Sequence, residues 1–193
     1  GMSPESTATY YTEINRLVNQ KKGGNISAPI VMVSVEFEEI VQCQKQSEWQ
    51  RAGEILAEAG KKLEMIGAEG IVLATNTMHK VAPQIERALS IPFLHILDAT
   101  ADAIKSRGLN KVALLGTKFT MSDNFYRDGL IVRGITPIVP NESAQNEIHR
   151  IIFDELCVGK FLPQSKAFYL DTIEFLRKQG AEGVILGCTE IGL

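Results

Sequence analysis

The stretch GAEGIVLATNTMH, residues 67–79, returns later in the chain as GAEGVILGCTEIG, residues 180–192. Each copy opens Gly-Ala-Glu-Gly and continues with three apolar residues and one small residue. It then places a side chain of the nucleophilic type, Thr75 in the first copy and Cys188 in the second. Solenoids repeat at intervals of about 20–50 residues, so this wider spacing indicates a duplicated domain instead.

Short apolar runs of strand length alternate with longer amphipathic stretches along the whole chain. Strands are predicted at Pro29–Val35, 70–75, 91–96, 111–116, 136–140 and 183–188. Helices are predicted at 5–22, 47–66, 81–90, 100–107, 120–130, 141–158 and 164–179. This alternation predicts an α/β fold of mainly parallel sheets with helices on both faces. We therefore expect two three-layer domains related by a pseudo-twofold axis, residues 1–97 and 98–193.

The two halves differ in what surrounds the repeated motif. In the second half, the strand KVALLG leads into a turn at Thr117 and then a helix, whereas the first half opens with GMSPEST, which matches only the turn and the helix start. The first copy of the repeat is followed by a helix, a strand and a helix, whereas CTEIGL is the last stretch given. This asymmetry predicts a first domain without its first strand and a second domain without its final segment. The alternative is that Gly1 is a cloning remnant in front of Met2.

Composition argues against several classes of partner. The formal net charge of −3, without a basic stripe, argues against nucleic acid. No apolar run is long enough to span a bilayer, and we expect no signal peptide. Three scattered cysteines fit a reducing cytoplasm better than a disulfide framework. The histidines form no short metal motif, and no Walker loop or Gly-x-Gly-x-x-Gly fingerprint occurs, so no metal or cofactor is expected.

Both copies of the repeat place polar side chains directly after a predicted strand. In sheets of this kind, ligands bind beyond the carboxyl ends of the strands. Helices that begin at these turns would offer free N–H groups to a carboxylate, although Thr and Asn are also common helix N-caps without any ligand. Two acid/base groups on opposite sides of one cleft, Thr75 and Cys188, would suit inversion at a carbon. The spacing is equally compatible with a nucleophilic cysteine.

Four ordered motifs, GMSPEST, ATNTMHK, LLGTKFTM and GAEGVILGCTEIGL, resemble the aspartate/glutamate racemase family over essentially the whole chain, and especially its broad-specificity L/D-aspartate/glutamate branch. The resemblance implies racemisation without pyridoxal phosphate or metal, and a homodimer. Most members use two cysteines as the acid/base pair. Here the second is Cys188, while Thr75 stands at the first position, as it does in the broad-specificity branch. A hydroxyl is a much weaker acid than a thiol, so we expect Cys188, as a thiolate, to abstract the α-proton of one enantiomer and Thr75 to return a proton on the other face.

The resemblance also implies a set of substrate-binding residues in the turns: Met2, Ser3, Gln44, Asn76, Thr77, Thr117, Thr120, Thr189 and Glu190. Thr7 belongs to the same first turn. A cation is expected for the side-chain carboxylate of the substrate, and Lys160 is the candidate, with Lys166 as a rival. His79 either orients Asn76 or contacts the cleft, or else it is a hydrogen-bonded histidine at a helix start.

Other interpretations stay open at this stage. Cys157 is expected in the core, and Cys43 is more easily explained as core than as a cleft residue. The threonine at position 75 could mark a one-base enzyme or a protein that only binds an amino acid or dicarboxylate. Maleate isomerases and arylmalonate decarboxylases, which use cleft cysteines, are a further alternative.

Overall fold

The computed structural model describes residues 1–192, and the chain divides into two compact units, Gly1–His95 and a second that begins at Ile96. The elements of the first unit are α1 (Pro4–Lys22), α2 (Phe37–Lys45), α3 (Trp49–Met65), β1 (Ile71–Val72), the 3₁₀-helix η1 (Thr77–Val81), α4 (Ala82–Arg87) and β2 (Phe93–Leu94). Those of the second unit are α5 (Ile96–Lys105), β3 (Lys111–Gly116), α6 (Lys118–Ser122), α7 (Asn124–Val132), β4 (Thr136–Ile138), α8 (Glu142–Asp154), η2 (Leu156–Val158), α9 (Pro163–Lys178), β5 (Gly183–Gly187) and η3 (Thr189–Gly192).

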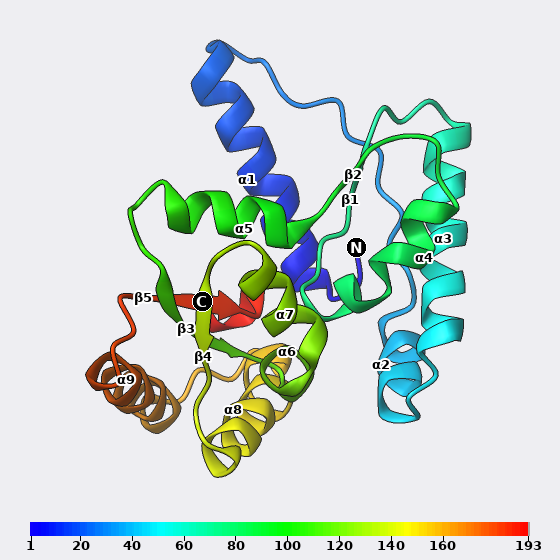
Figure 1. Cartoon of the computed structure of the whole chain (residues 1–193). Helices are drawn as coiled ribbons and strands as arrows, with labels where there is room; N and C mark the ends of the chain where they lie inside the picture. The colour runs from blue at the N-terminus through cyan, green and yellow to red at the C-terminus, as the bar shows by residue number, and fades with distance from the viewer. Residues whose placement is uncertain (193) are drawn as a thin grey trace. The chain divides into compact units, whose positions relative to one another are not determined.

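The second unit is a sheet of three parallel strands in the order β4-β3-β5. Side chains on β3 alternate between two cores: Val112 and Leu114 pack with residues of α5 and α7, whereas Ala113 and Leu115 pack with residues of α8 and α9. Figure 1 shows α5 on one side of this sheet and α8 and α9 on the other. Because a parallel sheet buried on both faces needs apolar residues at successive positions, KVALLG reads as a continuous apolar run. The predicted α/β architecture with parallel sheets is confirmed.

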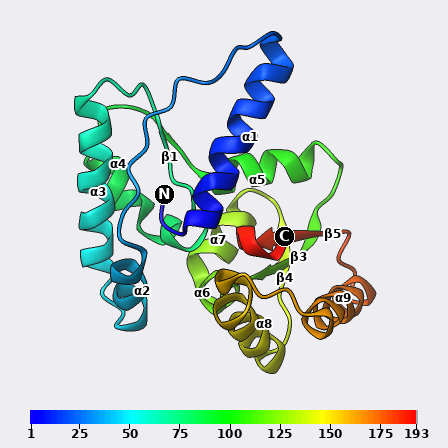
Figure 2. The same cartoon turned by 180° about the vertical axis from the view of Figure 1, so that it is seen from behind.

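The first unit contains a shorter parallel pair, β1 with β2, in which Ile71 lies opposite Phe93. Its core lies mainly between the helices and includes Ile40 of α2, Leu56 of α3 and Ile85 of α4. Figure 2 shows the long segment that leaves α1 and runs past β1 towards α2.

Local signals explain where the long helices begin and end. The side chain of Ser3 accepts a hydrogen bond from the N–H of Ser6 at the start of α1, Pro4 occupies its first turn, and Gly23 follows its end at φ 78°. An N-cap of this kind contributes about 1 kcal/mol to stability. The predicted helices at 5–22, 47–66 and 164–179 are confirmed as α1, α3 and α9 within one or two residues.

Two of the predicted elements differ clearly from the structure, and one helix was missed. Pro29–Val35 is extended but belongs to neither sheet, and Val31 is 55% exposed. A strand needs a partner along its edge, and within residues 1–192 this segment is hydrogen-bonded only where Gly1 meets Val33 and Val35. The region 120–130 is two helices, because Asp123 leaves the helical conformation at ψ 138° and caps α7. Helix α2 was not predicted.

Within residues 1–192, no helix combines the length and the apolar character needed to cross a membrane.

Candidate active site

The first candidate turn follows β1 and carries Thr75 and Asn76. Both residues are half-buried, while Ala74 before them is buried. The N–H of Thr75 donates to the carbonyl of Leu73 at 2.8 Å, which turns the backbone sharply before η1 begins at Thr77. Within residues 1–95, the hydroxyl of Thr75 makes no hydrogen bond, so it is available to a bound molecule.

The side chain of His79 is hydrogen-bonded to the backbone of this turn. Its Nδ1 lies 2.7 Å from the carbonyl oxygen of Thr75, and its ring is 4.8 Å from that of His95. Burial, followed by the neighbouring His95, lowers the pKa of His79 from 6.5 to about 4. The imidazole is therefore neutral near pH 7, and Nδ1 carries the hydrogen because a carbonyl oxygen can only accept. This hydrogen bond is the one expected of a hydrogen-bonded histidine at a helix start, which was one of the interpretations of His79.

The start of α1 lies against the same turn. Ser6 Oγ donates to the carbonyl of Ala74 at 3.3 Å, and Thr7 Oγ1 donates to the carbonyl of Ser3 at 2.7 Å. Ser3 is buried as the N-cap, and the side chain of Met2 belongs to the hydrophobic core of this unit. Ser6 was missed by the sequence reasoning. The sequence feature that could have revealed Ser6 is its position three residues after a capping serine, in the first turn of a helix.

Gln44 lies on α2, not after a strand as expected, and it is only 6% exposed. Its Nε2 donates to Met78 Sδ at 3.1 Å, so it packs against η1, next to the buried Thr77. Cys43 is buried in the core of this unit, as the simpler interpretation held.

The second unit builds its candidate site at the carboxyl ends of β3 and β5. Gly116 and Gly187 lie opposite each other in the register of the two strands. A Cβ on Gly187 would lie 2.8 Å from the carbonyl oxygen of Leu115, so the strands approach closely here and only glycine fits. Thr117 caps α6 by accepting a hydrogen bond from the N–H of Thr120 at 3.2 Å, and both threonines are buried.

Cys188 and Glu190 form a pair at the end of β5. The thiol of Cys188 donates to Glu190 Oε2 at 3.0 Å, and Glu190 is only 4% exposed. Burial, together with the charge of Glu190 and this hydrogen bond, raises the pKa of Cys188 well above its ordinary value. The surroundings therefore favour the thiol, which differs from the expected resting thiolate. Thr189 between them is half-buried.

A cavity of about 490 Å³ opens beside Glu190, and Cys188 is not among its lining residues. Its lining includes Glu190 at one border and Ser165, Lys166 and Tyr169 of α9 at another. Lys166 therefore borders the same space as Glu190. Lys160 is exposed in the loop between η2 and α9, and its backbone N–H donates to the carbonyl of Glu155 at 2.9 Å.

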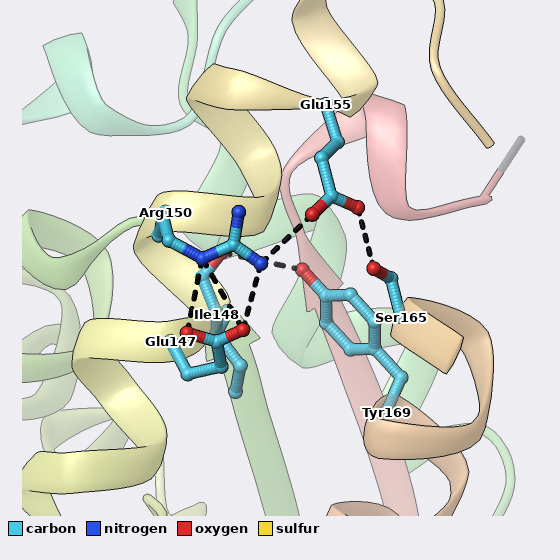
Figure 3. A network of polar contacts seen from close by, with 6 residues as sticks. All are labelled: Glu147, Ile148, Arg150, Glu155, Ser165 and Tyr169. Carbon is cyan, nitrogen blue, oxygen red and sulfur yellow. Dashed lines mark hydrogen bonds and ion pairs between the residues drawn. The ribbon is translucent and has the colours of Figure 1, made fainter. Parts of the chain in front are cut away.

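An ionic network fixes the helices around this cavity (Figure 3). Arg150 contacts Glu147 at 2.7 Å and Glu155 at 2.8 Å, and Glu155 accepts a second hydrogen bond from the hydroxyl of Ser165. This hydroxyl, followed by Arg150, lowers the pKa of Glu155, which is 5% exposed. The network links α8 to the start of α9 and was missed by the sequence reasoning. No local motif announces it, because its members lie up to 18 residues apart, from Glu147 to Ser165.

The structure thus assembles two sets of the expected residues, one in each unit. In the first unit, Ser3, Asn76 and Thr77 lie around the turn at Thr75, with Gln44 next to η1. In the second unit, Thr117, Thr120, Thr189 and Glu190 lie at the strand ends with Cys188. Cys157 packs at the edge of the core of its unit. Among residues 1–192, no cluster of three or more His, Cys, Asp or Glu side chains could hold a metal ion.

Comparison with known proteins gives consistent matches. The sequence profile of a family described as Asp/Glu/hydantoin racemase matches residues 1–193. A glutamate racemase of Lactiplantibacillus plantarum is 26% identical over 125 residues, which are 64% of this chain and 44% of that protein, so the match spans under half of that relative's length. The broad specificity amino-acid racemase RacX of Bacillus subtilis is 23% identical over 99% of this chain and 83% of its own length. A crystal structure of a candidate Asp/Glu racemase from Yersinia pestis superposes with a TM-score of 0.91, at 45% identity, over 99% of this chain and 85% of that one.

Proposed function

The chain belongs to the Asp/Glu/hydantoin racemase family, and from this premise we propose that it is an amino-acid racemase that interconverts the L and D forms of aspartate and glutamate without a cofactor. The names of its relatives support this substrate class, since they include a glutamate racemase and a candidate Asp/Glu racemase.

The observation that carries the proposal is the position of two proton-bearing side chains in the repeat. Thr75 and Cys188 follow the same Gly-Ala-Glu-Gly strand, in the same register, and each stands at the carboxyl end of a parallel strand. In the proposed reaction, one of them acts on each face of the α-carbon of a single bound substrate. Two such groups are what stereoinversion through a carbanion requires.

On the Cys188 side, we assign Glu190 as the group that exchanges a proton with the sulfur. The Sγ–H···Oε2 hydrogen bond of 3.0 Å gives the proton a direct path. When Cys188 acts as a base, its proton passes to Glu190, and the thiolate that remains takes the hydrogen from the α-carbon. When Cys188 acts as an acid, the S–H bond breaks towards the carbanion and Glu190 returns a proton to the sulfur. The substrate ammonium group would favour the thiolate electrostatically.

On the other face, Thr75 is a donor more than a base. Its hydroxyl delivers a proton to the carbanion, directly or through one water, and is itself reprotonated from solvent. The reverse step would need an alkoxide, which is a much stronger base than a thiolate and is rarely populated near neutral pH. The kcat of the direction that begins at Cys188 is therefore expected to be the higher one, with KM higher in the same ratio, because two enantiomers of equal free energy require equal kcat/KM in both directions.

The carbanion needs electrostatic stabilisation at the substrate carboxylate, which oriented N–H and hydroxyl groups can supply. In this proposal, they come from the turns at Ser3, Asn76, Thr117 and Thr189, together with Thr77 and Thr120. Lys166 is favoured over Lys160 as the cation for the substrate side chain, because it borders the cavity beside Glu190. The homodimer and the cytoplasmic location stay predictions from the resemblance.

A second candidate, a one-base enzyme, is favoured by the hydroxyl of Thr75, which has no basic side chain bonded to it within residues 1–95. Incubation with L-glutamate or L-aspartate in deuterated water separates the candidates. Deuterium at Cα together with the D isomer supports the racemase. Exchange without inversion supports one-base chemistry, and saturable binding without exchange would leave only an amino-acid or dicarboxylate binding protein.

A further inference from the structure

The short helix α6 follows the turn at Thr117 and depends on another helix for its position. It has only five residues, Lys118–Ser122, and an isolated helix of this length is not stable in water. Helix α8 packs against it, and Figure 1 shows the two helices next to each other. The hydroxyl of Ser122, at the end of α6, donates to Gln145 Oε1 of α8 at 2.6 Å. The geometry of the Thr117 turn therefore depends on contacts with α8.

His149 of α8 contacts the residue directly after Thr117. The backbone N–H of Lys118 donates to His149 Nδ1 at 3.2 Å. Because an N–H group can only donate, Nδ1 carries no hydrogen here and the imidazole is neutral. The N–H of Lys118 is also one of the groups at the start of a helix that have no partner within that helix. His149 therefore supports the turn as an acceptor, which only the neutral ring can be at this nitrogen.

The surroundings of His149 favour this neutral form. The centroid of its ring lies 6.0 Å from that of Phe119 on α6 and 4.8 Å from that of Phe153 on α8. Burial, and then the charge of Lys118, lowers the pKa of His149, while Asp154 acts in the opposite direction. Among residues 1–192, β3 and α9 also pack against α8, but they bring no charge that shifts this pKa. The imidazole is therefore neutral near pH 7 and gains its proton below pH 6.5.

Protonation affects the histidines of the two units differently. His79 Nδ1 donates to the carbonyl of Thr75, and it would still donate as a cation. His149 Nδ1 accepts, so a proton on this nitrogen removes the acceptor and sets two donors against each other. The contact between α8 and the start of α6 is then lost.

We propose that His149 is a positioning residue for the reaction: as a neutral imidazole it holds the Thr117 turn in the geometry that binds the substrate carboxylate, and its protonation releases the turn. The inference rests on the proposed function, in which Thr117 and Thr120 stabilise that carboxylate. Both threonines are buried, with 3.2 Å between their hydroxyl oxygens, and Lys118 lies between them in the chain. A displacement at Lys118 therefore disturbs both hydroxyls. His149 acts through the turn and not on the reacting atoms.

The test compares two variants with the unaltered chain, using aspartate or glutamate as the substrate. His149→Asn keeps an acceptor, Oδ1, close to the place of Nδ1 but cannot take up a proton. His149→Phe keeps an aromatic ring and removes the acceptor. At pH 7.5 the Phe variant should lose about 10–100-fold in kcat/KM, while the Asn variant stays within about threefold of the unaltered chain. The fall in kcat/KM between pH 7.5 and pH 5 should be smaller by about threefold or more in the Asn variant, because the titrating group is gone.

Equal pH profiles in the unaltered chain and in His149→Asn would overturn the inference. So would full activity at pH 7.5 in a Phe variant that is folded by circular dichroism. If the Phe variant does not fold, the pH profile of the Asn variant and the NMR measurement below decide the outcome.

NMR tests the contact without any measurement of activity. The backbone amide shift of Lys118 should follow the titration of the His149 imidazole with the same midpoint, and this titration should be missing in His149→Asn. An amide that does not follow the imidazole would reject the role of His149. If the amide does follow it but the unaltered chain racemises neither substrate at any pH, the proposed function is refuted while the support of the turn by His149 stands.

Discussion

The turns at Thr75 and Cys188 begin from the same sequence and end in different chemistry. At Cys188, the side chain itself is hydrogen-bonded, and its proton is shared with the buried carboxylate of Glu190. At Thr75, the backbone is held instead, through His79, and the hydroxyl makes no hydrogen bond within residues 1–95. The repeat thus preserves the position of the reactive group in both units. The chemistry of that group depends on a later residue, which is Glu190 for Cys188 and His79 for Thr75. In the proposed reaction, one turn cycles a proton and the other mainly delivers one.

The largest expected effect comes from removing the thiol of Cys188, which in the proposed reaction both takes up and gives back a proton. Cys188→Ala should lower the rate of deuterium exchange at Cα by about 10²–10⁴-fold, because Glu190 then lacks the sulfur through which, in the proposed reaction, it exchanges a proton with the substrate. Proton NMR of glutamate or aspartate in deuterated water measures this loss. Cys157→Ala is the matched control, and it should leave exchange within about threefold, because the effect is tied to proton transfer at position 188. An equal loss in both variants would point to damaged packing of the second unit.

The free energy of unfolding should depend on pH through His79, which is hydrogen-bonded to the Thr75 turn. His79 has a folded-state pKa of about 4, below its unfolded value of 6.5, so the unfolded chain binds more protons between these two values. Its stabilising contribution is complete above pH 6.5 and is lost as the pH falls towards 4, by at most about 3 kcal/mol. Urea unfolding from pH 7 to pH 4 measures this slope.

The control for this dependence is His79→Gln, in which the part of the slope due to His79 should disappear. Burial lowers the pKa of His149 as well, so a smaller slope of the same sign should remain. If the variant does not fold, an NMR titration of His79 in the unaltered chain decides the point, and a midpoint near 6.5 would contradict the burial argument.

The two turns can be made chemically alike. Thr75→Cys should raise the kcat of the slower direction by about 10–100-fold, since a thiolate is accessible near neutral pH and an alkoxide is not. Thr75→Ser, which keeps a hydroxyl, is the control and should retain the asymmetry. Rates measured from each enantiomer separately, by polarimetry or chiral chromatography, give the ratio. Equal kcat values from the two enantiomers, measured at saturating substrate in the unaltered chain, would remove the predicted difference.

The smallest effect tests the pairing of Cys188 with Glu190. Glu190→Gln keeps an oxygen near the thiol and removes the negative charge, so the pKa of Cys188 should fall. The pH dependence of alkylation by iodoacetamide, followed at Cys188 by mass spectrometry, measures the shift. Glu182→Gln is the control, because Glu182 lies at the opposite end of β5. An unchanged alkylation midpoint would mean that Glu190 does not act on the sulfur.

Much of this organisation was predictable because local patterns encode it. KVALLG and the long amphipathic helices carry their own periodicity, and the repeat places Thr75 and Cys188 after strands without any knowledge of packing. Pro29–Val35 was misjudged because its sequence favours a strand, but a ladder also requires a neighbouring edge. Helix α2 was missed because its stretch is short and carries several charged residues, and its buried side, with Ile40 and Cys43, is recognisable only against the core.

The site was less predictable than the fold. The hydrogen bond between Cys188 and Glu190 depends on the direction in which their side chains point. The sequence shows only that the two residues lie two positions apart. The contact of His79 with Thr75, and the network of Arg150 with Glu155 and Ser165, depend on turns and helix ends whose geometry is set by tertiary packing. Pattern reasoning therefore located the reactive positions but not the proton partners that define their chemistry.

The glycine contact between Gly116 and Gly187 bears on any attempt to redesign this protein for bulkier molecules. Even one methyl group at Gly187 would collide with the carbonyl of Leu115 and crowd Thr120, and a methyl group at Gly116 would lie only 3.1 Å from the carbonyl oxygen of Gly187. Space for a larger substrate has to come from smaller side chains on the surrounding helices, for example at Thr120 or at Leu170 on the cavity wall. Libraries that randomise the helices and leave both glycines untouched should therefore yield more folded members than libraries that vary the strand ends.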